Sequence, residues 1–272
     1  MATFRYEERD LYYEDMGSGE PLLVLNGVFM SCESWKLFER RFTEKNRLLL
    51  LDFPDQGKSA KMDREYTQDL PAGAAGALIE HLGLSSVNLA GISYGGEVAM
   101  KLASLRPEKV KRLVLANTTA YTSPWLRDIG HSWEYACKSY DGHQFFKTCI
   151  PIIYSPWFYE KNYEWCAARE ETFVKTFAPE VYDSFARLIR SAEFHDEREN
   201  LRKITASTLV ISSEYDYVTP LCQQRELVDL IPEAVGHVVI EGCGHASMYE
   251  KPSEFASLLL GFVNGSAEVR VA

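Results

Sequence analysis

The segment from Asn88 to Glu97 constrains the fold more than any other part of this sequence. An apolar run ends at Gly91, a serine held between glycines follows, and a helical pattern then begins. A serine on such a tight strand-to-helix turn takes strained backbone angles, and its hydroxyl projects above the edge of a sheet. The following helix points its backbone N–H groups and positive dipole end at the same place. The pattern G-x-S-x-G therefore predicts that Ser93 can attack a carbonyl while the Tyr94 N–H holds the oxyanion.

This motif alone has a second interpretation, because a glycine-rich turn can start a helix without any catalytic role. The rest of the chain favours catalysis, since short apolar runs alternate with helical patterns. Such runs are too short for helices and fit strands that are buried on both faces of a parallel sheet. The alternation predicts right-handed crossovers, with helices covering both faces. The expected buried strands are 21–25, 47–51, 87–90, 110–116, 207–212 and 237–240, and the expected helices are 34–41, 67–84, 94–105, 223–231 and 252–263.

The tyrosine-rich region 4–14 alternates weakly between apolar and polar residues and is interpreted as two short antiparallel strands. Together with the buried strands, it predicts an α/β fold with a mostly parallel, eight-stranded sheet. Residues 1–120 and 202–272 are expected to form the two parts of this core. Ligands of such sheets bind outside the carboxyl ends of the strands, where Ser93 is expected.

Between these two parts the character of the sequence changes. The segment 121–201 has no clear strand pattern and is helical and dense in aromatic residues. A structureless loop of that length is improbable in a compact domain, so we expect an inserted helical lid. Most of its aromatic rings must pack the lid itself, and the others indicate an apolar substrate portion. The candidate substrate contacts are Trp125, Tyr154, Trp157 and Phe158 in the lid, with Asn26 and Phe29 after the first buried strand.

A serine nucleophile needs a base, and the base needs an orienting acid. A histidine in a glycine-rich turn after the last strand, His245, and a carboxylate after the preceding strand, Asp216, supply both. The chain order Ser93, Asp216, His245 resembles the α/β-hydrolase superfamily over nearly the whole chain. The acid of that family stands four residues before a proline, which selects Asp216 over Glu214 and Asp55.

The resemblance also implies the second oxyanion donor, the backbone N–H of Val28. Family members often carry His-Gly where this chain has Asn26-Gly27. The residue before the glycine steadies the oxyanion loop by hydrogen bonding, which asparagine can also do. Asn26-Gly27 and the segment 52–59 are locally similar to the acyltransferase branch that makes 3-hydroxyacyl dimers for rhamnolipids.

The resulting hypothesis is a serine hydrolase that cleaves a carboxylic ester, thioester, lactone or related acyl bond of a small-molecule substrate, with no metal and no other cofactor. An acyltransferase that passes the acyl group to a hydroxylated acceptor is the first alternative. A catalytically silent binding protein on the same fold is the second. Haloalkane dehalogenase chemistry is disfavoured, because those enzymes carry an aspartate where this chain has Ser93.

Composition bears on partners and location. A formal net charge of -10 argues against binding to nucleic acid and to anionic membranes. The sequence has no apolar run long enough to span a bilayer, and its N-terminal residues lack the apolar core of a signal peptide, so we expect a cytoplasmic protein. The six cysteines form no C-x-x-C pair and are expected to be reduced and mostly buried, without a disulfide. The sequence does not indicate an oligomeric state.

Overall fold

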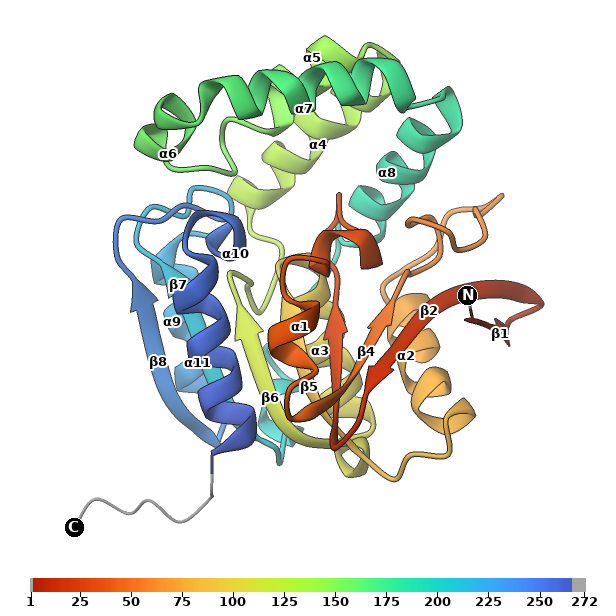
Figure 1. The fold of residues 1–272 in the computed structure, drawn as a ribbon, viewed down its shortest axis with the longest axis vertical. Helices are drawn as coiled ribbons and strands as arrows, with labels where there is room; N and C mark the ends of the chain where they lie inside the picture. Colours follow the sequence, from red (N-terminus) through yellow and green to blue (C-terminus); the bar gives the residue numbers. More distant parts are fainter. Residues whose placement is uncertain (1, 266–272) are drawn as a thin grey trace.

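A sheet of eight strands runs through the computed structural model, which describes residues 2–265 (Figure 1). The strand order is β1-β2-β4-β3-β5-β6-β7-β8. The first two strands pair antiparallel, β2 pairs antiparallel with β4, and all other neighbours are parallel. This confirms the predicted mostly parallel sheet. Its strands are β1 (Ala2–Tyr6), β2 (Arg9–Gly17), β3 (Glu20–Leu25), β4 (Asn46–Leu51), β5 (Val87–Ile92), β6 (Val110–Ala116), β7 (Ser207–Ser213) and β8 (Ala234–Ile240).

Helices cover both faces of this sheet, and the leucine run of β4 shows why (Figure 1). Successive side chains of a strand point to opposite faces. Leu48 and Leu50 accordingly pack into one apolar cluster, and Leu49 and Leu51 into the other. Because both faces are covered, a continuous apolar run is stable as a strand. The covering helices are α1 (Glu39–Phe42) and α11 (Pro252–Asn264) on one face, and α2 (Asp69–His81), α3 (Tyr94–Leu105) and α9 (Leu221–Leu230) on the other.

The region expected as one helix over 34–41 is divided in the structure. A 3-10 turn, η1 (Cys32–Trp35), precedes the short α1. Cys32 and Trp35 are both buried. Side chains three residues apart eclipse one another in a 3-10 turn, so this geometry turns both toward the sheet. The helical spacing over 34–41 did not indicate this change of helix type.

Five helices lie between β6 and β7, over the carboxyl ends of the parallel strands (Figure 1). We refer to them as the lid helices. Ser123, Asp141 and Ser155 start three of them, each accepting a hydrogen bond from a backbone N–H in the first turn. Many of the aromatic side chains of this region pack against one another, most of them edge-on, as expected. The lid helices are α4 (Pro124–Lys138), α5 (Gly142–Cys149), α6 (Pro156–Lys161), α7 (Tyr163–Thr176) and α8 (Pro179–Ser191).

An ion pair joins the lid to the core. Arg187 on α8 donates two hydrogen bonds to Asp55, at 2.7 and 3.0 Å from its two carboxylate oxygens. The Asp55 side chain is fully buried. A bidentate pair of this kind fixes orientation as well as distance, so it positions α8 over the sheet edge.

Two further expectations concern thiols and membranes. All six cysteines are free thiols, and Cys222 alone among them is exposed. In the part of the chain from residue 2 to 265, no helix is both long enough and apolar enough to cross a membrane.

Candidate active site

Ser93 stands at the turn between β5 and α3 with φ of 53° and ψ of -124°. A positive φ is strained for any residue other than glycine, and here the surroundings hold it. The Ser93 N–H donates to the Ala116 carbonyl at 2.9 Å. A side chain at Gly91 would collide with the Gly95 backbone, and one at Gly95 would collide with the Leu25 carbonyl. The two glycines of the motif are therefore required by close packing around the turn.

The structure brings Ser93, His245 and Asp216 into one hydrogen-bonded series. Ser93 Oγ lies 2.9 Å from His245 Nε2. His245 Nδ1 lies 2.8 Å from Asp216 Oδ2 and 3.0 Å from Oδ1. An ionised carboxylate only accepts hydrogen bonds, so Nδ1 carries the imidazole proton and Nε2 is left to accept from the serine hydroxyl. In this tautomer His245 can remove the proton of Ser93.

Asp216 is held as an anion by several donors. Its carboxylate accepts from the backbone N–H groups of Val218 at 3.0 Å and Thr219 at 2.8 Å, and from Asn117 Nδ2 at 3.0 Å. Burial alone would raise the pKa of Asp216, but His245 and these hydrogen bonds together hold that pKa below its usual range. The carboxylate therefore stays ionised while it orients the histidine.

The other carboxylates considered as the acid lie elsewhere. Glu214 is exposed, and its Oε2 accepts from the Gly242 N–H at 2.9 Å. Asp55 is occupied by Arg187 of the lid. Neither of them forms a hydrogen bond with His245 among residues 2–265.

Asn117 is a site residue that the sequence reasoning missed. It follows β6 with φ of 47°, so its side chain turns back toward the site. Its amide donates to Asp216, while its Oδ1 accepts from Ser247 Oγ at 2.7 Å. The available signal was its position, because a polar residue directly after an apolar parallel strand lies at the ligand-binding edge.

The loop that carries Val28 is fixed from below by Asn26. The Asn26 side chain donates to the Leu51 carbonyl at 2.7 Å and accepts from Trp35 Nε1 at 2.8 Å. It also donates to Gln56, whose Nε2 donates in turn to the Gly27 carbonyl at 2.8 Å. Val28 and Tyr94 both line the cavity beside Ser93. Asn26 itself is completely buried, so it supports this loop and does not face a substrate as its sequence position suggested.

We expect Asn26→Ala to lower kcat by about 10- to 100-fold, with a smaller effect on KM, because the loop that presents the Val28 N–H loses its anchor. The free energy of unfolding should also fall by about 1–3 kcal/mol, since the Trp35 N–H loses its buried partner. Steady-state kinetics and denaturant unfolding measure both effects. Asn88→Ala is the matched control, because Asn88 is a buried asparagine of β5 whose side chain has no hydrogen-bond partner. Equal kcat values in the two variants would contradict the anchoring role.

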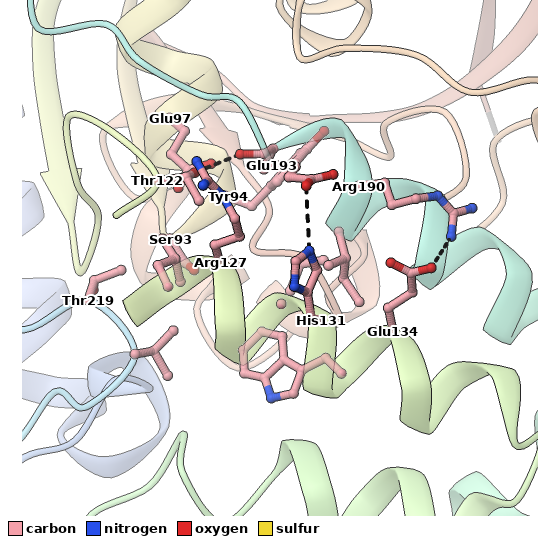
Figure 2. A pocket seen from close by; sticks show the side chains of 17 residues that line it. Ser93, Tyr94, Glu97, Thr122, Arg127, His131, Glu134, Arg190, Glu193 and Thr219 are labelled. Carbon is pink, nitrogen blue, oxygen red and sulfur yellow. Dashed lines mark hydrogen bonds and ion pairs between the residues drawn. The ribbon is translucent and has the colours of Figure 1, made fainter. Parts of the chain in front are cut away.

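Two cavities meet at Ser93. The first extends under α4 and α8 (Figure 2). The second extends on the His245 side. Ser93, Val28 and Trp133 line both of them. Two cavities on either side of the nucleophile can accept the two arms of one substrate.

Phe29 and Tyr154, two of the predicted substrate contacts, line the second cavity. The walls there are mainly apolar, with Arg169 as a cationic exception. Its guanidinium lies 4.8 Å from the ring centre of Trp165 and 5.7 Å from that of Tyr249. An apolar pocket with one charged group orients a ligand that has one charged end.

The other predicted aromatic contacts lie outside both cavities. Trp125 is half exposed, and its indole N–H donates to the Tyr217 carbonyl at 2.7 Å. Trp157 donates to the Gly242 carbonyl at 3.1 Å and packs edge-on against Tyr215. Phe158 stacks on Tyr154 with ring centres 5.1 Å apart. These three predictions are corrected, because each ring is used to join the lid to the core or to back the cavity wall.

Glu97, one turn after Ser93 on α3, is a buried acid that the sequence reasoning did not single out. It lines the first cavity and accepts a hydrogen bond from Gln68 Nε2. Burial raises the pKa of Glu97 to about 8, against the effect of Gln68. The group is therefore mostly uncharged in the folded protein at neutral pH.

This raised pKa predicts that stability falls as pH rises. The folded state keeps the Glu97 proton up to about pH 8, whereas the unfolded chain loses it near the ordinary glutamate pKa of 4.5. The contribution of Glu97 to the free energy of unfolding is thus fully present below pH 4.5 and is lost as pH rises through about 8. Between these values wild type should lose about 1.4 kcal/mol of unfolding free energy per pH unit relative to Glu97→Gln. Denaturant unfolding at several pH values tests this, with the exposed Glu160→Gln as control, and parallel curves for wild type and Glu97→Gln would refute it.

The part of the chain covered by residues 2–265 contains no cluster of three or more His, Cys, Asp or Glu side chains that could hold a metal ion.

Comparison with known proteins gives likenesses that span the core, the site and the lid helices. The family model described as the alpha/beta hydrolase fold matches residues 20–252. MGS-M2, an alpha/beta hydrolase enzyme from a Medee basin deep-sea metagenome library, is 40% identical and matches with a TM-score of 0.96 over 100% of both chains.

Two curated relatives are more distant. The 2-hydroxymuconate semialdehyde hydrolase of Pseudomonas sp. strain CF600 is 25% identical over 92% of this chain and 88% of its own. The 2-hydroxy-6-oxo-6-(2'-aminophenyl)hexa-2,4-dienoic acid hydrolase of Metapseudomonas resinovorans is 27% identical over 94% of this chain and 88% of its own. The likeness to these relatives thus includes the lid, where substrate contacts differ most among proteins of one fold.

Proposed function

Because this chain belongs to the α/β hydrolase fold family and is a hydrolase, we propose that it cleaves a carboxylic ester or related acyl bond through an acyl-enzyme on Ser93. The substrate is a small, partly apolar molecule. The observation that carries this proposal is the hydrogen-bonded series from Ser93 through His245 to Asp216, located where two cavities meet.

In the first step, His245 Nε2 takes the proton of Ser93 while Oγ attacks the acyl carbon. The carbonyl electron pair moves onto oxygen, and the backbone N–H groups of Tyr94 and Val28 stabilise that oxyanion. Asp216 keeps the Nδ1 proton in place and stabilises the imidazolium.

In the second step, the imidazolium gives its proton to the leaving oxygen as the carbon–oxygen bond breaks. The acyl group remains on Ser93. Water then attacks the acyl carbon, with His245 as base, and releases the acid and the free serine. A hydroxylated acceptor in place of water would give the acyltransferase reaction from the same intermediate, so the two activities differ only in which nucleophile reaches Ser93.

A second candidate is hydrolysis of a carbon–carbon bond, favoured by the relative's name and by Arg169. A 2-hydroxy-6-oxo-hexadienoic acid contains neither an ester nor an amide, so its hydrolysis must break a carbon–carbon bond beside the ketone. Arg169 takes part in no ion pair among residues 2–265 and lines the second cavity. Its guanidinium could there hold the carboxylate of such an acid.

Hydrolysis of p-nitrophenyl esters of increasing chain length tests the main proposal. We expect turnover that is blocked by a fluorophosphonate probe, with the label on Ser93.

Parallel assays with the aminophenyl dienoic acid named above test the second candidate. A kcat/KM for that acid well above the ester values, and its loss in Arg169→Met, would replace ester hydrolysis by carbon–carbon bond hydrolysis. If Ser93 is labelled but neither substrate class is turned over, acyl transfer to an alcohol becomes the function to assay. Failure of Ser93 to react would contradict all three reactions and leave the silent binding protein.

A further inference from the structure

We propose that the first cavity contains an anion-binding subsite built on Arg127, so that the substrate arm entering it carries a carboxylate. The inference rests on the proposed function, because it describes the substrate of the same serine. It concerns the cavity under α4 and α8 and not the second cavity, where Arg169 lies.

Arg127 belongs to the second turn of α4, and its side chain enters this cavity. In Figure 2 it projects from α4 toward the part of the wall formed by Ser93, Tyr94 and Glu97. Its Nε is buried and has no hydrogen-bond partner, and its guanidinium takes part in no ion pair among residues 2–265. A buried donor without a partner is costly, so a ligand that accepts from it is strongly favoured there.

The Arg127 guanidinium contacts the ring of Phe194, and this contact leaves its N–H donors available. The guanidinium carbon lies 5.9 Å from the ring centre of Phe194, which is 81% exposed. A ring stacked against a guanidinium uses its flat face, whereas the N–H donors lie along its edge. Phe194 therefore supports the group without replacing a hydrogen-bond acceptor.

The remaining charges on the cavity wall already have partners. Arg190 Nη1 lies 2.8 Å from Glu134 Oε1, and its Nη2 bonds Glu65 at 2.7 Å. His131 Nε2 lies 3.5 Å from Glu193 Oε1, as the dashed line in Figure 2 marks. Among the lining residues, Arg127 is thus the cation without an opposite charge.

Glu97, which lines the same cavity, does not supply an opposite charge to Arg127. Its carboxyl is hydrogen-bonded to Gln68, and burial keeps it mostly uncharged at neutral pH. The positive charge at the cavity wall is therefore available to a ligand.

The chemistry of the wall also selects the kind of anion. A single planar guanidinium matches the two oxygens of a carboxylate. A dianion such as a phosphate monoester would leave one charge uncompensated, because Arg127 is the one cation of this wall without an ion-pair partner among residues 2–265. We therefore assign the subsite to a monoanionic carboxylate at the end of a short arm.

The test compares Arg127→Met with Arg202→Met. Arg202 is an exposed arginine of η3 (Leu201–Lys203), so both variants lose the same charge and only one changes the cavity. The anionic substrates are p-nitrophenyl hemiglutarate and carboxyphenyl butyrate, which carry a carboxylate on the acyl arm and on the leaving group. Their neutral counterparts are p-nitrophenyl hexanoate and phenyl butyrate. The measured quantity is the ratio of kcat/KM for each anionic ester to that of its neutral counterpart.

For one of the two pairs, we expect this ratio to be about 10- to 100-fold lower in Arg127→Met than in Arg202→Met. The pair that responds identifies the arm in the first cavity. Arg127→Lys should recover part of the ratio, because it keeps the charge but loses the planar fork. Equal ratios in Arg127→Met and Arg202→Met for both pairs would overturn the subsite.

If the proposed ester hydrolysis is wrong, the wild-type protein will not hydrolyse even the neutral esters, which distinguishes that outcome from the absence of the subsite. Calorimetric titration with hexanoate, which carries one carboxylate, then tests the subsite without turnover. We expect the dissociation constant to rise at least about tenfold in Arg127→Met relative to Arg202→Met, and an unchanged constant would refute the subsite. Circular dichroism of each variant shows whether the fold is retained.

Discussion

Ser93→Ala should lower kcat for p-nitrophenyl butyrate by roughly 10⁵- to 10⁶-fold, because catalysis by the three residues is lost as a unit when the nucleophile is removed. The residual rate would come from the oxyanion donors and from substrate binding. Stability should change little, since the hydrogen bond of the Ser93 hydroxyl among residues 2–265 is the one to His245. Progress curves at high enzyme concentration, with thermal unfolding of the same samples, measure both effects.

Ser104→Ala provides the matched control for this substitution. Ser104 lies in the same helix α3, and its hydroxyl donates to the Lys101 carbonyl. It lines neither cavity. This variant should keep the wild-type kcat and still react with the fluorophosphonate probe. If Ser93→Ala stays active and is labelled at another residue, Ser93 is not the nucleophile.

Asp216→Asn should lower kcat by about 10⁴-fold at neutral pH, because an amide can stabilise the wrong tautomer of His245. The expected loss has a second cause in this protein. The backbone N–H groups of Val218 and Thr219 both point at Oδ1, whereas Asn117 points at Oδ2. Either orientation of the amide therefore places its NH₂ against existing donors, and the thermal midpoint should also fall.

Glu214→Gln is the control for this prediction, since Glu214 is the competing acid at the end of the same strand. Its carboxylate accepts from the Gly242 N–H, which a glutamine oxygen can replace. We expect nearly wild-type kcat in this variant. A large loss in Glu214→Gln with little effect in Asp216→Asn would reverse the assignment of the acid.

The sequence determined the sheet and the turn at Ser93, because both are encoded by neighbouring residues, and the chain order of Ser93, Asp216 and His245 indicated the family. The run Leu48–Leu51 can be buried on both faces only within a covered parallel sheet, as the structure confirms. Gly91 and Gly95 are needed because no side chain fits there, and that need follows from the local turn. Backbone requirements and strand periodicity act over a few residues, so a single sequence reveals them.

The tertiary structure decided which lid side chains face the cavities. In the sequence, Trp125 and Trp157 were predicted as substrate contacts on the same grounds as Tyr154. Their indole groups instead bond carbonyls 92 and 85 residues further along the chain. Asn117 and Arg127 matter for a similar reason, since one meets Asp216 across 99 residues and the other enters a cavity formed with α8 and the core. Such contacts join segments that are distant in sequence, and the local pattern around each residue carries no record of its partner.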